Sequence, residues 1–178
     1  SDVYKRQSLA LSGLIMQQMM QNKFVSPTTA GTMEWAKLGI LLSLLFFPNG
    51  HILIKLLFAV VLSIVGTFLF VQLINLIRAK DVIFVPLLGI MIGGILSSFT
   101  TFVALRTNAL QSIGNWLTGN FAVITSGRFE VLYLTIPLLI LAFVFANHFT
   151  IAGMGKDFSH NLGVSYEKII KIALFITA

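Results

Sequence analysis

The sequence predicts an all-α polytopic membrane protein. Of its 178 residues, 57% are hydrophobic and only 10% are charged, and the mean hydropathy is +0.93. Since a soluble domain carries about 25% charged residues, this chain has too little polar surface to be covered by water. Its apolar residues gather in runs separated by short polar segments, which is the pattern of successive membrane helices. We expect about five to six transmembrane helices.

Charge and residue types exclude several other functions. The net charge is +6, but the basic residues lie between apolar runs, so they indicate membrane topology and not binding of nucleic acid. The chain has no cysteine, which excludes disulfides and thiol catalysis. Asp157 and His160 have no third ligand nearby, so no metal site is predicted. We expect no enzyme and no cofactor.

The two ends of the sequence interrupt this pattern. Residues 1–7 carry no initiator Met and resemble a translated adapter scar, so we leave them out of the fold prediction. A signal peptide is the alternative, but no small-x-small cleavage site follows. Residues 8–178 then form a partial transmembrane domain, and its final helix, 169–178, is expected to be truncated.

The first apolar run, residues 8–21, leads directly into a polar loop. This loop begins at Asn22 and contains Pro27 and Gly31. Irregular backbone is tolerated at membrane depth only where protein or a watery cavity surrounds it. The loop is therefore either a pathway-lining segment or an ordinary helix end. Gln17 has the same two interpretations, because a glutamine can line a polar path or hydrogen-bond to a neighbouring helix.

The remaining apolar runs follow in order. They cover residues 32–47, 56–77, 82–105, 131–147 and, incompletely, 169–178. Glu34 and Lys37 are three residues apart and can pair on one helix face. Between the fourth and fifth runs, residues 107–129 place Trp116 and Phe121 among polar residues, which predicts a short helix at the membrane interface.

Small side chains form a stripe along the fourth run. Gly89, Gly93, Ser97 and Thr101 follow one another at steps of four, so they share one helix face. In lipid such a face permits close approach of a neighbouring helix. The same face can also line a substrate path, and the two roles can coexist.

The distribution of Lys and Arg predicts the orientation. One set of loops and adjoining helix ends holds Lys23, Lys37, Arg78, Lys80, Lys156, Lys168 and Lys171, and the opposite set holds Lys55, Arg106 and Arg128. The richer set is expected to face the cytoplasm. It includes the polar hinge 148–168.

Two segments resemble one family, the iron-siderophore and vitamin B12 ABC importer permeases. The run from Ser12 to Gly31 is similar to its S-G-x-x-x-Q-x-x-x-x-N-P-L-A-x-P-x-x-x-G pattern, and 153–164 is similar to its L-G-x-x-x-A-x-x-L-G-[VL] segment. The order and lengths of the apolar runs between them also agree. The amino-acid sequence of residues 22–31 is most similar to that of the permeases for iron chelates.

The resemblance implies a permease of about ten membrane helices in the bacterial cytoplasmic membrane. It implies a homo- or heterodimer with a second permease subunit, two cytoplasmic ABC ATPase subunits and an extracytoplasmic substrate-binding protein that delivers a ferric siderophore. Asn22 and Phe24 map to the cytoplasmic gate, and Gln17, Gly89, Gly93, Ser97 and Thr101 to the gate or pathway. The coupling helices within 148–168 map to Gly155, Lys156, Ser159, Leu162 and Gly163.

The chain departs from the family pattern at several of these positions. Lys23-Phe24 replaces the usual Pro-Leu, which adds charge and bulk beside the expected gate. Ser159 replaces Ala, and Lys156 stands where an acidic residue is common. Two other functions stay open: a secondary carrier with a broken helix near 22–31, and a structural membrane subunit that transports nothing.

Overall fold

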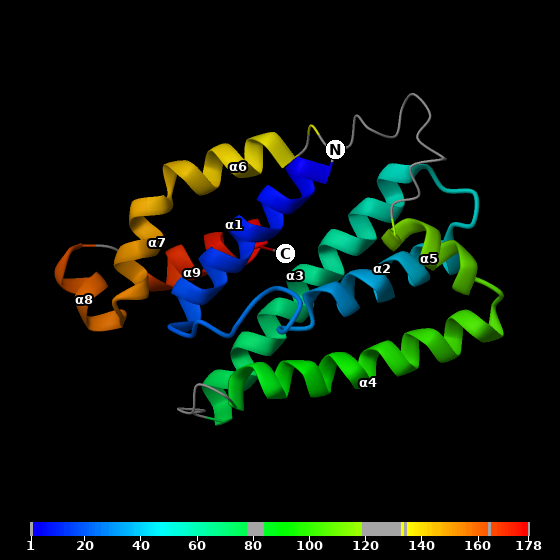
Figure 1. Ribbon diagram of the computed structural model, residues 1–178, viewed down its shortest axis with the longest axis horizontal. Helices are drawn as coiled ribbons and strands as arrows, with labels where there is room; N and C mark the ends of the chain where they lie inside the picture. Colours follow the sequence, from blue (N-terminus) through cyan, green and yellow to red (C-terminus); the bar gives the residue numbers. More distant parts are fainter. Residues whose placement is uncertain (1, 78–83, 119–132, 134, 164, 178) are drawn as a thin grey trace. The chain divides into compact units, whose positions relative to one another are not determined.

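The computed structural model describes residues 2–77, 84–118, 133, 135–163 and 165–177, and the regular elements found there are helices (Figure 1). The all-α class is therefore confirmed. The chain divides into two compact units, Ser1–Pro27 with Phe129–Ala178 (unit 1) and Thr28–Arg128 (unit 2). Unit 2 is thus inserted in the sequence between the two parts of unit 1.

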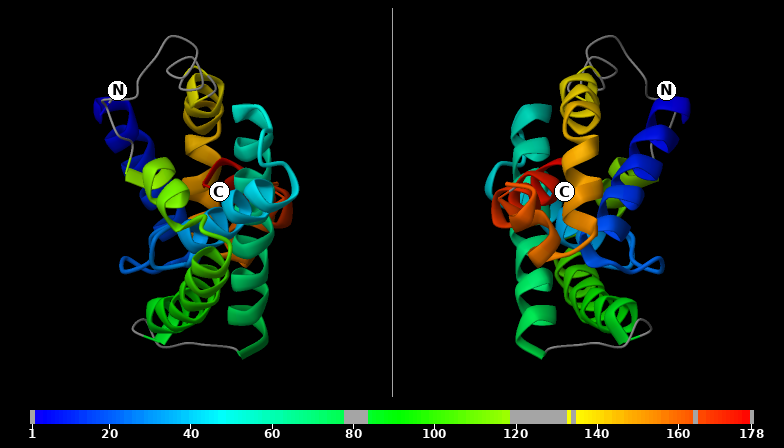
Figure 2. Two further views of the ribbon diagram at one scale, coloured as in Figure 1. Left: turned by 90° about the vertical axis from the view of Figure 1, so that its right-hand side faces the viewer. Right: turned by 90° about the vertical axis from the view of Figure 1, so that its left-hand side faces the viewer.

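The described residues of unit 2 form four helices. They are α2 (Thr32–Phe46), α3 (Ile52–Ile77), α4 (Phe84–Arg106) and α5 (Leu110–Thr118). Helix α2 packs against α3 and α4, and the short α5 packs against α2 and α4 (Figure 2). Ile40, Leu41, Ala104 and Ile113 form a buried cluster where α2, α4 and α5 meet.

Small and hydroxyl-bearing residues hold α2 against α3. Gly39 lies against the backbone of Phe58 with no room for a Cβ atom, and Gly66 receives the indole ring of Trp35. The hydroxyl oxygens of Thr32 and Thr67 are 2.9 Å apart and hydrogen-bonded, and both residues are buried. Close backbone approach and interhelical hydrogen bonds are the contacts that stabilise helix pairs in lipid.

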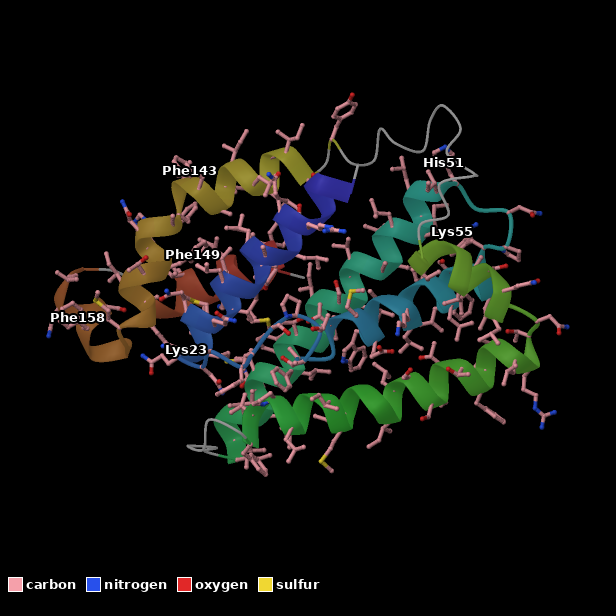
Figure 3. All side chains as sticks on the ribbon, in the orientation of Figure 1. Lys23, His51, Lys55, Phe143, Phe149 and Phe158 are labelled. Atoms are coloured by element: carbon pink, nitrogen blue, oxygen red, sulfur yellow. The ribbon has the colours of Figure 1, made fainter. Side chains whose placement is uncertain are left out.

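Unit 1 consists of α1 (Asp2–Met20), α6 (Thr135–Val144), α7 (Ala146–Gly153), α8 (Lys156–Asn161) and α9 (Tyr166–Thr177). Helix α1 packs against α7 and α9. The buried cluster between them contains Ile15, Met19, Ala142, Phe149, Ala152, Ile169, Ala173 and Ile176. Figure 3 shows Phe149 within this cluster, whereas Phe143 on α6 points outward and is 83% exposed.

Two described helices are long and apolar enough to cross a membrane, over Ile52–Ile74 and Phe84–Arg106. Helices α6 and α7 pass the same test when taken together, as one span that is bent by 57° at the break between them. Helices α2 and α9 are 15 and 12 residues long, shorter than the ~20 residues of a straight crossing. The expected number of five to six crossings stays a prediction.

The structure corrects several expected boundaries. Helix α3 begins at Ile52, before residue 56, and α9 begins at Tyr166, before residue 169. Helix α7 continues to Gly153, so the expected hinge 148–168 contains the end of α7, all of α8 and the start of α9. His148 lies in the first turn of α7.

The bend between α6 and α7 lies at Phe145, although Pro137 is the only proline in this run. Pro137 is the third residue of α6, where a backbone amide has no partner within its own helix and none is lost. Within the segment 107–129, α5 forms the expected short helix. Phe121 lies outside the described residues.

Candidate gate and coupling site

Helix α1 ends in a hydrogen-bonded backbone motif, after which an irregular loop begins. The amide of Gln21 donates to the carbonyl of Gln18 (3.2 Å), and the amide of Asn22 donates to the carbonyl of Gln17 (3.1 Å). With Gln21 at a φ of 48°, this is the Schellman pattern, whose left-handed position is usually glycine. A side chain there costs about 1–2 kcal/mol. The expected break at Asn22 is thus confirmed as a defined helix stop.

The loop after this stop keeps its polar residue inside and its aromatic residue outside. Asn22 is 4% exposed, and its Oδ1 accepts a hydrogen bond from the backbone amide of Phe24 (3.0 Å). Phe24 is 64% exposed, whereas Val25 is fully buried. Lys23 also lies on the outside (Figure 3). The Asn22 side chain therefore fixes the backbone that presents Phe24.

The end of α7 lies directly against the end of α1. The side-chain amide of Gln21 donates from Nε2 to the carbonyl oxygen of Gly153 over 2.9 Å. A Cβ atom added at Gly153 would lie 2.5 Å from the side-chain Oε1 of Gln18 and 3.2 Å from the backbone oxygen of the same glutamine. Glycine therefore favours this close approach, and Gln18 of α1 and Gln21 directly after it meet the same residue of α7.

A sharp corner connects α7 to α8. Gly155 precedes α8 with a φ of 112°, a conformation that glycine adopts without strain. Ser159 is fully buried, and its Oγ lies 2.8 Å from the carbonyl oxygen of Gly155 and 3.2 Å from that of Ile151. The hydroxyl can donate to either carbonyl. Ser159 thus holds the first turn of α8 against the end of α7.

Apolar side chains on and directly after α8 are exposed. Phe158 and Leu162, one helical turn apart, are 51% and 55% exposed, and Figure 3 shows Phe158 on the outer side. Gly163 ends the segment with a φ of 72°. Lys156 begins α8, but its side chain is not among the parts that the structure describes. At the start of α9, burial raises the pKa of the Tyr166 hydroxyl.

The small-residue stripe of α4 belongs to unit 2 and has two parts. Gly89 lies against the backbone of Thr29 and the Phe70 ring of α3, and Gly93 lies against Gly31 and the Glu34 side chain of α2. This half therefore packs against both the loop before α2 and the neighbouring helices. Ser97 and Thr101 line an open hollow of about 270 Å³, together with Lys37. The two glycines thus lie in the packed part of the stripe, and the pathway role of the stripe stays a prediction.

Lys37, which lines this hollow, forms the expected ion pair with Glu34. Lys37 Nζ lies 2.6 Å from Glu34 Oε1. The second carboxylate oxygen, Oε2, is buried without a hydrogen-bond partner in the described part of the chain. The hydroxyls and the ammonium group that line the hollow can hold a polar solute by hydrogen bonds. Among the described residues, no group of three or more His, Asp or Glu side chains could hold a metal ion.

The structure brings the sequence-predicted residues together in two groups. Gln17, Asn22 and Phe24 lie in unit 1 with Gly155, Ser159, Leu162 and Gly163, and the stripe residues lie in unit 2. The side-chain bond from Gln21 to Gly153 was not predicted, because no local pattern connects residues 132 positions apart. A glutamine directly before the helix-breaking Asn22, where glycine is usual, is the signal that could have drawn attention to it.

Comparison with known proteins places this arrangement in a family. The family model described as the FecCD transport family matches residues 7–178. The chain is 51% identical to the petrobactin import system permease protein YclN of Bacillus subtilis (strain 168), over 96% of this chain and 54% of that protein. It is 34% identical to the ferric-anguibactin transport system permease protein FatD of Vibrio anguillarum, over 96% of this chain and 54% of that protein.

A solved structure of a metal-chelate type ABC transporter in an inward-facing conformation has a similar fold. The TM-score is 0.61 at 21% sequence identity, and the match covers 96% of this chain and 55% of the other. The chain thus spans about half the length of the curated relatives it matches. Since the family model covers nearly the whole sequence, this chain is a member of the FecCD transport family.

Proposed function

We propose that this chain is part of the permease subunit of an ABC importer that moves a ferric siderophore across the bacterial cytoplasmic membrane. The observation that carries the proposal is the family match over residues 7–178. The names of two relatives, which refer to petrobactin import and ferric-anguibactin transport, support an iron chelate as substrate. The apolar helices α3 and α4 support a place within lipid.

The proposed importer contains further subunits. A second permease, identical or related, completes the pathway, and two cytoplasmic ABC ATPases supply the energy. An extracytoplasmic binding protein delivers the chelate. On this proposal the chain itself carries no catalytic residue, because ATP hydrolysis takes place on the ATPase subunits. Membrane lipid contacts the exposed apolar side chains of α3 and α4.

We assign the contact with the ATPase to α8. Phe158 and Leu162 are apolar, exposed and one turn apart, so together they offer a small hydrophobic surface that a partner groove can cover. The buried Ser159 and the Gly155 corner hold this surface at a fixed angle to α7. A push on α8 is then transmitted to the rest of unit 1 instead of being absorbed by a loose loop.

We assign the gate to the loop of Asn22 and Phe24. An exposed aromatic side chain on a backbone fixed by a buried asparagine can obstruct a path until the backbone moves. Ser97 and Thr101, which line the hollow of unit 2 with Lys37, supply neutral hydroxyls for the chelate. Such groups bind a large polar solute weakly enough to release it.

The experiment that tests the proposal requires the full-length reading frame that contains this sequence. The complete complex would be reconstituted in liposomes, and ATP hydrolysis would be measured with and without binding protein loaded with ferric petrobactin. Leu162→Asp places a charge on the apolar docking surface and is expected to abolish the substrate-stimulated part of the hydrolysis. Leu162→Met keeps the surface apolar and is expected to retain it.

Unchanged stimulation in Leu162→Asp would refute the assignment of α8. Uptake of radiolabelled ferric petrobactin that needs an ion gradient and no ATPase would refute the importer itself and favour a secondary carrier.

A further inference from the structure

Gln21 combines two properties that a helix stop alone does not require. Its backbone adopts the left-handed conformation at a φ of 48°, where glycine is the residue without strain. Its side chain then reaches across to α7 and donates to the carbonyl of Gly153 over 2.9 Å. What glutamine adds at this position, compared with glycine, is therefore the hydrogen bond to α7.

The acceptor of this bond is a carbonyl oxygen at the C-terminal end of α7. The last carbonyls of a helix have no amide partner within that helix, and Gly153 is the final residue of α7. The Gln21 amide thus caps α7 from a position 132 residues away in the sequence. Gly153 also has no Cβ, so α1 approaches it closely enough for Gln18 to lie against the same residue.

The bond connects two segments to which the proposed function assigns separate roles. On one side, Gln21 is followed by Asn22, whose side chain holds the amide of the exposed Phe24. On the other side, Gly153 is followed by the corner at Gly155, to which the buried Ser159 ties α8. Hydrogen bonds and short stretches of backbone therefore form a continuous path from Phe24 to α8.

We propose that Gln21 is a positioning residue that couples the gate loop to α8 through the carbonyl of Gly153. When α8 moves, the end of α7 moves with it and carries Gln21, which begins the loop that presents Phe24. The bond lies at the surface of unit 1, so it can break and re-form without opening the buried cluster around Phe149. This inference rests on the proposed function and adds one residue to it.

Three substitutions separate coupling from a merely structural role. Gln21→Glu keeps the size of the side chain, but a carboxylate accepts hydrogen bonds where the glutamine amide donates one. Gln21→Gly removes both the side chain and the backbone strain. Gln21→Lys keeps an N–H donor. If Gln21 only ended the helix, Gln21→Gly would be at least as good as the native residue. If Gln21 couples the gate loop to α8, Gln21→Gly and Gln21→Glu should uncouple transport from ATP hydrolysis, and Gln21→Lys should not.

The measurement is ferric petrobactin uptake per ATP hydrolysed by the full-length reconstituted complex, together with the melting temperature of each variant. We expect uptake per ATP to fall about fivefold in Gln21→Gly and Gln21→Glu, the size of effect that one net hydrogen bond produces. Gln21→Lys should stay within about twofold of the native complex, and the melting temperature of Gln21→Gly should not fall. Gln111→Glu, which changes an exposed glutamine of unit 2, is the matched control.

Full uptake per ATP in both Gln21→Gly and Gln21→Glu would overturn the inference. So would an equal loss in Gln21→Lys, or in the control, because the donor would then not be the cause. A native complex whose ATP hydrolysis does not respond to ferric petrobactin would instead refute the proposed function, and this inference with it.

Discussion

Two glycines on α4 offer a direct test of how the small-residue stripe is used. A Cβ atom at Gly89 would overlap the backbone oxygen of Thr29 and come within 3.0 Å of the Phe70 ring. At Gly94, five residues further along the same helix, a Cβ atom would meet no atom within 4 Å. The same substitution, glycine to alanine, thus enters a filled site at one position and open space at the other.

The expected difference in stability follows from these surroundings. Within a helix, alanine is favoured over glycine by up to about 1 kcal/mol, and this gain applies equally to Gly89→Ala and Gly94→Ala. Overpacking costs about 1–3 kcal/mol, and it applies only at Gly89, where the obstructing atom belongs to the backbone and cannot rotate away. Gly89→Ala should therefore be less stable than Gly94→Ala by about 2 kcal/mol.

The assay is thermal unfolding of the two full-length variants in the same detergent, followed by tryptophan fluorescence. We expect the melting temperature of Gly89→Ala to lie below that of the native permease, and that of Gly94→Ala to lie at or above it. Equal melting temperatures of the two variants would refute the packing of the Thr29 segment against Gly89. They would mean that Gly89 faces open space, as a residue lining a path does.

Two further predictions concern polar pairs of unit 2 and use the same unfolding measurement. Thr67 donates to the carbonyl of Ser63 and is also bonded to Thr32, so Thr67→Val leaves the buried Thr32 hydroxyl without a partner and should destabilise more than Thr32→Val. The double variant should recover about 0.6 kcal/mol relative to the sum, and strict additivity would contradict the interhelical bond. Lys37→Met leaves the Glu34 carboxylate unpaired and should cost about 1 kcal/mol, which Lys37→Met with Glu34→Gln should largely restore. Equal stability of Lys37→Met and of the double variant Lys37→Met with Glu34→Gln would show that the ion pair contributes nothing.

The parts of the fold that depend on local pattern could be predicted from the sequence. Helix α4 was expected over residues 82–105 and covers Phe84–Arg106, because an uninterrupted apolar run determines a membrane helix without reference to its neighbours. The pairing of Glu34 with Lys37 was likewise predictable from their spacing of three residues. The helix stop at Asn22 was marked by the change from apolar to polar residues.

The contacts between distant segments could not be predicted in this way. The bend at Phe145 has no proline or glycine to mark it, whereas Pro137 sits in the first turn of α6 and causes no break. The sequence shows only that Ser159 stands where the family pattern has alanine, whereas in the structure its hydroxyl holds the corner between α7 and α8. That role depends on burial, which only the folded chain defines.

The insertion of unit 2 within unit 1 imposes an order on biosynthesis. Unit 2 is continuous in sequence, so all its helices leave the ribosome before the second part of unit 1 has been made. Helix α1 emerges before unit 2, yet the carbonyl that Gln21 at its end caps follows 132 residues later. At about 5–20 residues per second, this corresponds to a wait of roughly 7–26 s. During that interval the apolar face of α1 that later packs against α7 and α9 needs temporary cover, which lipid or the insertion machinery must provide.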